Sequence, residues 1–372
     1  QVILIDALES ALGTDLGLTH IEPGFAETDR FLIHATAPSG MTFNFADADP
    51  EADRRNEPAL NWFAWKFGRR YDTMAALPLP AEAVTSPASI RFEALRAIWL
   101  ARDLVTLRSP EQAPLPLAWH GQGPQPVAIF RSSWQGQDAS YLGTKGGRAS
   151  VNHGHMDAGS FVLEAMGIRW AHDLGRQNYH ALESQGFERL FDRDVQSPRW
   201  SLFRLGPYSH NTVTLNDGLH DPDATGKLMD VTSGEGFGEA TYALGEILPA
   251  CERWTRNFRL EHGGSLRVTD VIVGMEPGTR VRWAMLTGAE IAISSDGKSA
   301  ELTQGGKTLS VKAEAPRDYR FRSAPARNEP AFRFDEPNPG RSLLLLEGSA
   351  GASGAVKLRV MLDWDHQQDE TE

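Results

Sequence analysis

Two imidazole-rich segments and one carboxylate carry the chemistry that could bind a metal ion. His153, His155 and Asp157 alternate along the chain, and alternate residues of a β-strand point to the same side. Asp173 follows an apolar stretch and His210 precedes another, so neighbouring strands could bring these two together. Imidazole nitrogen and carboxylate oxygen are ligands that zinc favours. These residues are therefore candidate ligands of a metal site, held either by the local trio or by residues far apart in the chain.

Each of these residues also has an ordinary structural explanation. Three polar residues at period two describe the solvated face of any strand, and a lone Asp173 or His210 is typical of a turn. Tyr179, six residues after Asp173, could transfer protons or could be a sheet-edge tyrosine with a solvated hydroxyl. Arg176 and Arg204 could bind an anionic sugar, although a lone arginine on a strand is usually solvated. The residue patterns alone leave these alternatives open.

Composition and charge narrow the class of protein. The chain has 372 residues, of which 41% are hydrophobic and 23% charged, as in globular proteins. A formal net charge of -12 argues against a nucleic-acid partner, whereas a cleft with local arginines could still bind an acidic polysaccharide.

No apolar run approaches the roughly 18 residues of a membrane span, so we expect no membrane partner. Cys251 is the only cysteine, which excludes an internal disulfide. The chain begins at Gln1 without a basic leader, so we expect that an upstream segment has been removed.

The elements that must position these residues change character along the chain. Residues 2–12 read as a helix ended by Gly13, and a second helix opens at Pro58 and closes at Gly68. A third is expected to start at Ser86-Pro87, with Ile90, Ala94 and Ile98 at helical spacing. We therefore predict a helical region over residues 1–110.

From about Leu115 the pattern is one of short strands. Segments rich in Val, Ile, Trp and Phe are separated by Gly, Asn and Asp, as in residues 127–134, 212–215, 281–286 and 356–364. Residues 300–303 and 308–312 flank Gln-Gly-Gly-Lys, which predicts a β-hairpin. This density of strands predicts an antiparallel β-sandwich over residues 111–372, joined to the helices near residues 110–126.

Several motifs, taken in order, resemble signatures of the heparinase II/III family of polysaccharide lyases. They are residues 152–161 (NHGHMDAGSF), 167–175 (GIRWAHDLG) and 209–213 (SHNTV), preceded by residues 7–15, 38–40 and 43–47. The resemblance covers most of residues 1 to 220, while the remainder is similar only in being rich in strands. It implies the C-terminal helices of an (α/α) toroid followed by antiparallel β-sheet domains.

The resemblance also implies roles for particular residues. It implies that His155, Asp173 and His210 bind the zinc ion, rather than the local trio of His153, His155 and Asp157. His153 and Asn152 then face the substrate. In such lyases they would hydrogen-bond a uronate carboxylate, because the neighbouring C5 hydrogen becomes acidic only once that charge is neutralised. Tyr179 is then the candidate acid or base within this chain, and Arg176 and Arg204 are candidate substrate ligands.

The function implied is cleavage of a uronic-acid-containing polysaccharide, such as a glycosaminoglycan, by β-elimination, with zinc in a structural role. The family's toroid tyrosine would precede Gln1, so we expect a fragment whose missing N-terminal toroid segment is a partner of the chain. The alternatives are a non-catalytic, zinc-stabilised carbohydrate-binding β-sandwich and a zinc hydrolase. The family's habit implies a periplasmic or secreted protein, and a homo-oligomer is compatible with the sequence.

Overall fold

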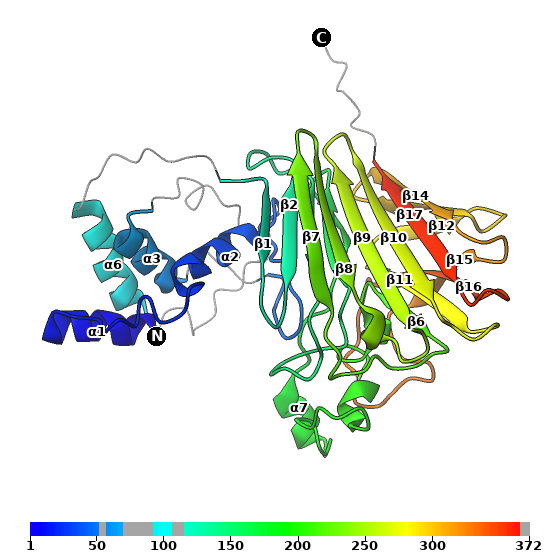
Figure 1. Ribbon diagram of the computed structural model, residues 1–372, viewed down its shortest axis with the longest axis horizontal. Helices are drawn as coiled ribbons and strands as arrows, with labels where there is room; N and C mark the ends of the chain where they lie inside the picture. Colours follow the sequence, from blue (N-terminus) through cyan, green and yellow to red (C-terminus); the bar gives the residue numbers. More distant parts are fainter. Residues whose placement is uncertain (52–56, 70–91, 106–114, 365–372) are drawn as a thin grey trace, which may run out of the picture. The chain divides into compact units, whose positions relative to one another are not determined.

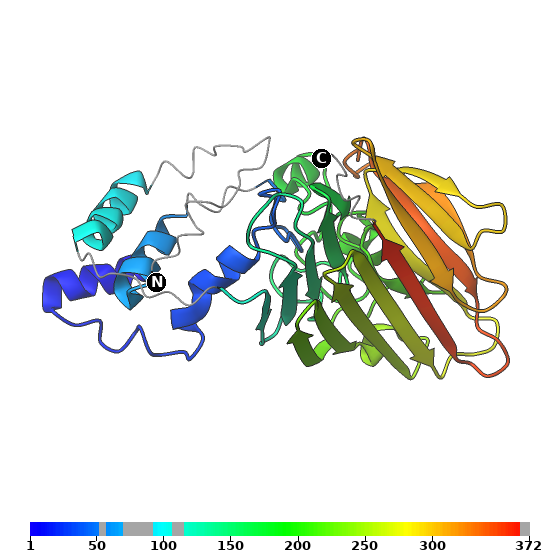
Figure 2. The same ribbon diagram turned by 90° about the horizontal axis from the view of Figure 1, so that it is seen from above.

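The computed structural model describes residues 1–51, 57–69, 92–105 and 115–364 (Figure 1). The described residues within Gln1–Thr42 and Glu51–Pro116 form one compact unit, and those within Phe43–Pro50 and Leu117–Glu372 form another. The first unit is helical and the second consists mainly of antiparallel sheets (Figures 1 and 2). The predicted class, mainly β with a helical N-terminal part, is confirmed. No helix in the described part of the chain is long and apolar enough to cross a membrane.

The described helices of the first unit are α1 (Val2–Leu12), η1 (Phe25–Glu27), α2 (Thr28–His34), α3 (Pro58–Phe67) and α6 (Glu93–Val105). Of these, α1 and α3 begin and end where local signals predict. Gly13 and Gly68 end α1 and α3 with φ of 72° and 63°, a conformation that costs glycine little. In α6, Trp99 is buried whereas Ile98 is 47% exposed, so Ile98 does not lie on the buried face of this helix. The expected start at Ser86-Pro87, like Ile90, lies outside the described residues.

The second unit contains three antiparallel sheets. Their strand orders are β1-β2-β3-β4-β5, β12-β13-β14-β17-β10-β9-β8-β7 and β15-β16-β11-β6. The strands are β1 (Ala118–Gly121), β2 (Val127–Arg131), β3 (Tyr141–Lys145), β4 (Phe161–Ala165), β5 (Ile168–Ala171), β6 (Val213–Leu215), β7 (Lys227–Gly234), β8 (Phe237–Ala243), β9 (Arg253–Glu261), β10 (Ser265–Val273), β11 (Arg280–Thr287), β12 (Glu290–Ile293), β13 (Ser299–Gln304), β14 (Lys307–Glu314), β15 (Arg320–Pro325), β16 (Ser342–Ser349) and β17 (Val356–Asp363). The connections hold α7 (Tyr179–Ser184), η3 (Pro198–Ser201), η4 (Pro207–Ser209) and η5 (Gly245–Ile247).

The predicted hairpin is present as β13 and β14. Its pairing closes with Gln304 opposite Lys307. Gly305 and Gly306 between them have φ of 57° and 74°, and a two-residue turn of this kind needs positive φ at both central positions. The Gly-Gly pair therefore determines the register of these strands.

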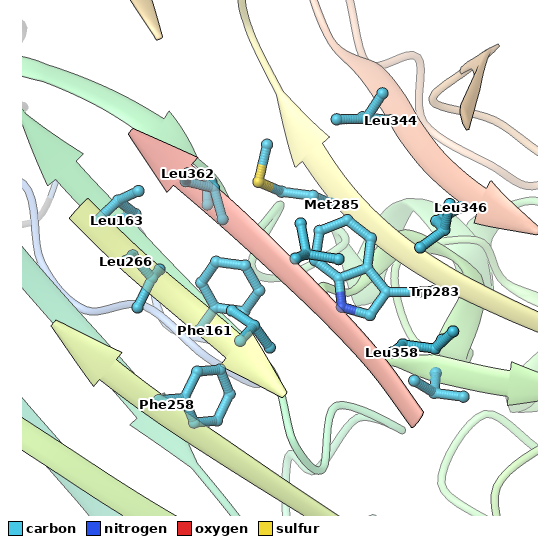
Figure 3. Packing of buried hydrophobic residues seen from close by; sticks show 14 of the residues in the cluster. Phe161, Leu163, Phe258, Leu266, Trp283, Met285, Leu344, Leu346, Leu358 and Leu362 are labelled. Carbon is cyan, nitrogen blue, oxygen red and sulfur yellow. The ribbon is translucent and has the colours of Figure 1, made fainter. Parts of the chain in front are cut away.

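Side chains from all three sheets meet in one hydrophobic core. Figure 3 shows Phe161 of β4, Phe258 of β9, Trp283 of β11 and Leu358 of β17 in this cluster, and each is fully buried. In β9 and β10 buried residues alternate with partly exposed ones, which is the pattern of a sheet with one face on a core. Burying a large apolar side chain stabilises the fold by about 1.5–3 kcal/mol. The core thus forms the rigid base from which the loops after β3 and β5 emerge.

Candidate active site

The segment that carries His153, His155 and Asp157 is a loop, since β4 begins only at Phe161. His153 has φ of 58°, and a Cβ on Gly154 would lie 2.3 Å from the carbonyl oxygen of Ala149, so the chain turns tightly here. The side chain of His153 is 59% exposed, whereas those of His155 and Asp157 are buried. The prediction that these three residues share one face of a strand is wrong, because strand alternation does not apply to a turn.

Asp157 is fully engaged by groups other than a metal ion. One of its oxygens contacts the ammonium of Lys145 in a buried ion pair, and the other accepts a hydrogen bond from the backbone N–H of Ala46 at 3.1 Å. Burial alone would raise the pKa of Asp157, but the charge of Lys145 lowers it below its ordinary value. Asp157 therefore anchors the loop.

The structure brings together the three residues that lie far apart in sequence. Nδ1 of His210 lies 2.8 Å from Oδ2 of Asp173, and the rings of His155 and His210 have centroids 5.5 Å apart. All three side chains are buried. Asp173 follows β5 by two residues and its Oδ1 accepts a hydrogen bond from Gly175 N–H at 2.8 Å, whereas His210 follows η4 directly.

The donor chemistry of this group fits zinc. Nδ1 of His155 and Nε2 of His210 are buried nitrogens without a hydrogen-bond partner among the described residues. Burial lowers the pKa of His155, which keeps that imidazole neutral and able to donate a lone pair. Burial also opposes charging of His210, but Asp173 raises its pKa above the ordinary value. Two imidazoles and a carboxylate form a zinc-type ligand set. Even so, no three His, Cys, Asp or Glu side chains in the described ranges form a ready-made metal site.

Asp47 is a site residue that the sequence analysis missed. Its Oδ2 lies 2.6 Å from Nδ1 of His153, and its Oδ1 lies 3.0 Å from Nε2 of His155. Asp47 also interacts electrostatically with the hydroxyl of Tyr179. Asp47 belongs to the short segment Phe43–Pro50, which is part of the β-sheet unit although it precedes the sheets by some seventy residues. Its motif resembled the family, but nothing local in the sequence indicates its partners.

Tyr179 begins helix α7 and does not lie at a sheet edge, so that structural alternative is wrong. Its ring is parallel to that of His153, with an interplanar angle of 4° and centroids 6.3 Å apart. Its hydroxyl accepts a hydrogen bond from Nη2 of Arg199 at 2.9 Å. Burial raises the pKa of Tyr179 to about 12, because the effect of desolvation exceeds that of the Arg199 charge. Tyr179 is therefore a protonated hydroxyl at neutral pH.

Arg199 is the second site residue that sequence analysis missed. It lies in η3 and is buried, and Nη2 also donates to the carbonyl of Gly154 at 2.9 Å. Nη1 donates to the carbonyl of Leu190 at 3.2 Å. The guanidinium thus links α7 to the loop that carries His153.

The other predicted substrate-binding residues, Arg176, Arg204 and Asn152, differ in how freely their side chains could bind a ligand. The side chain of Arg176 is 64% exposed and pairs with Asp49 at 3.0 Å. Arg204 donates to Asn338, to Glu336 and to a backbone carbonyl, so it holds the loop before β16 in place. Asn152 is exposed and its Oδ1 accepts from Nη2 of Arg193 at 3.3 Å, which leaves its amide N–H groups for a ligand.

Solved structures share this architecture at low sequence identity. The heparan sulfate lyase HepC from Pedobacter heparinus has a TM-score of 0.65 and 15% identity, over 98% of this chain and 51% of that one. A structure described as heparinase III has a TM-score of 0.67 and 12% identity, over 100% of this chain and 53% of that one. The chain thus spans about half the length of the structures that it matches.

Sequence comparison identifies the family. No curated protein matches the chain in sequence. A family model described as Heparinase II/III-like, C-terminal, matches residues 129–352, which is more than half of the chain and includes every predicted site residue. The chain therefore belongs to the heparinase II/III-like family.

Proposed function

We propose that this chain is the C-terminal part of a polysaccharide lyase that cleaves a uronic-acid-containing polysaccharide by β-elimination. Membership of the family and the fold support this proposal. The observation that carries it is the arrangement of an exposed imidazole, His153, parallel to a protonated tyrosine, Tyr179, whose hydroxyl accepts a hydrogen bond from Arg199.

The elimination requires two proton transfers. A base removes the hydrogen at C5 and the C5–H electrons form the C4=C5 double bond. The C4–O bond breaks as this double bond forms, its electron pair leaves with the glycosidic oxygen, and that oxygen takes up a proton. The C5 hydrogen becomes acidic when the uronate carboxylate is neutralised, and His153 with the amide of Asn152 would bind that carboxylate. Because its raised pKa keeps the Tyr179 hydroxyl protonated, it is suited to donate the proton to the leaving oxygen. In this proposal the base lies in the toroid segment that would precede the chain.

We further propose that one zinc ion binds His155, Asp173 and His210 and stabilises the fold. Both imidazole side chains are fully buried, which argues for a closed structural site and against a hydrolase with an open metal position. The metal would hold the loop before β4, the end of β5 and the start of β6 in one arrangement. No proton transfer in the elimination depends on it.

The test is release of unsaturated uronate, followed by its ultraviolet absorbance. The chain and a longer version with the preceding toroid segment are incubated with heparan sulfate and other uronic-acid polymers. We expect unsaturated product from the longer version and none from its His153→Ala variant. New reducing ends without unsaturation would identify a hydrolase instead, and binding without cleavage would identify a carbohydrate-binding module. Because such polymers occur outside the cytoplasm, we propose a periplasmic or secreted location, which fractionation of the cells that produce the protein can check.

A further inference from the structure

One carboxylate connects the part of the site that would face the substrate with the part that would hold the metal. Asp47 contacts Nδ1 of the exposed His153 through one oxygen and Nε2 of the buried His155 through the other, at 2.6 and 3.0 Å. The two histidines are separated by a single glycine, yet their side chains are 59% and 0% exposed. Asp47 therefore contacts one solvent-exposed imidazole and one buried imidazole.

The charge of Asp47 determines which ring nitrogens remain free. Each oxygen of Asp47 lies within hydrogen-bond distance of one imidazole nitrogen, Nδ1 of His153 or Nε2 of His155. An ionised carboxylate only accepts hydrogen bonds, so Nδ1 of His153 and Nε2 of His155 must each carry a hydrogen. Nε2 of His153 is then left for a ligand, and it can donate to a substrate carboxylate when the ring is an imidazolium, in which both nitrogens carry a hydrogen. Nδ1 of His155 is left as well, and it is one of the buried nitrogens without a partner in the described structure.

The backbone holds Asp47 firmly in this place. Ala46 N–H donates to Asp157 at 3.1 Å, and the side-chain amide of Asn44 donates to the carbonyl of Asp173 at 3.0 Å. Phe43 packs directly on Gly143, where an added Cβ would lie 2.6 Å from its ring. Residues 43–50 are thus hydrogen-bonded both to the loop of Asp157 and to the segment of Asp173. The fold therefore determines the position of the Asp47 carboxylate.

We propose that Asp47 is a positioning residue that orients His153 toward the substrate and His155 toward the metal, so that a single carboxylate links the two sites. The terms substrate and metal rest on the function proposed above. Outer carboxylates that orient a metal-binding histidine typically change metal affinity by about 10- to 100-fold when they are replaced. A misplaced catalytic group costs on the order of 100-fold in rate.

The decisive variant is Asp47→Asn, whose amide can accept from one ring but presents N–H groups to the other. We expect zinc affinity, measured by competition with a chelator, to fall by about 10- to 100-fold. In histidine-labelled protein, the nitrogen NMR spectrum should lose the signal of the Nδ1–H of His153 that is hydrogen-bonded to Asp47. In the longer, active version kcat should fall by about 100-fold with KM changed much less.

Glu239→Gln is the matched control. Glu239 is also a partly buried carboxylate that accepts from two side chains, Asn257 and Arg259, but it lies on β8. Its replacement should change neither zinc affinity, nor the histidine spectrum, nor kcat. Wild-type zinc affinity together with an unchanged His153 spectrum in folded Asp47→Asn would overturn the proposal.

Two further measurements keep the inference testable. If Asp47→Asn does not fold, Asp47→Glu keeps the charge but moves the carboxylate by one methylene, and wild-type zinc affinity and kcat in that variant would refute a positioning role. The zinc and NMR measurements do not depend on activity. If no polymer is cleaved by any version, the lyase proposal fails while the role of Asp47 is still decided.

Discussion

Replacing Lys145 with methionine should destabilise the β-sheet unit by about 3–5 kcal/mol, which is the usual cost of removing one partner from a buried ion pair. The side chains of Lys145 and Asp157 are 1% and 2% exposed. Methionine fills most of the volume of the lysine stem but leaves the carboxylate of Asp157 without its counter-charge. Among the described residues, the carboxylate then keeps one hydrogen bond, from the backbone N–H of Ala46. The loss of free energy therefore comes from an uncompensated buried charge.

Lys307→Met provides the matched comparison. Lys307 also pairs with an aspartate, but the side chains of Lys307 and Asp138 are 44% and 75% exposed. Exposed pairs of this kind contribute about 0–1 kcal/mol. The double variant Lys145→Met with Asp157→Asn should recover part of the loss, because it removes the stranded charge.

Urea unfolding, followed by tryptophan fluorescence, measures these differences. The tryptophans Trp170, Trp254 and Trp283 are buried in the core of the β-sheet unit and report on its unfolding. The reasoning would be refuted if Lys145→Met lowered the free energy of unfolding by no more than Lys307→Met does. That result would mean that the charge of Lys145 is not needed to stabilise buried Asp157.

The same pair predicts how stability depends on pH. Burial would raise the pKa of Asp157, but Lys145 and the two nearby imidazoles lower it below its ordinary value. The pKa of Asp157 is thus lower in the folded state than in the unfolded state, where it is about 3.9. The stabilisation by the ion pair is therefore complete above about pH 3.9 and is lost as the pH falls through the pKa of the folded state. In Lys145→Met the acid loss due to Asp157 should shrink, which urea unfolding between about pH 5 and pH 3 can measure.

The remaining predictions concern the metal and the substrate. In metal analysis, His210→Ala should lose roughly one equivalent of zinc while His153→Ala retains it; the reverse result would favour the local trio. Chelation should lower the melting temperature, since a ligand at about 100 times its Kd contributes about 2.7 kcal/mol; an unchanged melting temperature after verified removal of zinc would argue against a structural role. His153→Ala in the longer, active version should lower kcat on the order of 100-fold or more with little change in KM, and unimpaired elimination would exclude His153 from the mechanism.

Local signals predicted the elements of the fold well. Gly13 and Gly68 end helices in the left-handed conformation, and Gly305-Gly306 form the turn between β13 and β14. At each of these places the backbone needs a conformation that one residue type adopts readily, so the sequence carries the information within a few positions. The buried face of α6 was not predicted because it depends on the helices packed against it, and there Trp99 is buried instead of Ile98.

The partners of the site residues could not be predicted in the same way. Asp47 meets His153 and His155 over 106 and 108 positions of sequence. Arg199 meets Gly154 over 45. No periodicity connects residues that separate segments bring together, and the similarity to a family supplied His155, Asp173 and His210 only because their motifs are each distinctive.

The segment from Asn152 to Asp157 shows that a pattern of candidate ligands can be interpreted only when the backbone conformation between them is known. Alternation places side chains on one side only if the residues between them are extended, and Gly154 and Gly159 flank positions where the chain turns. In the turn, His153 emerges to solvent, His155 enters the core, and Asp157 is neutralised by Lys145. Three residues that looked equivalent thus acquire three different environments, and the contact that distinguishes the two histidines comes from one carboxylate, Asp47. Glycines within a cluster of candidate ligands therefore favour a loop, in which each ligand must be assigned by its own distant partner.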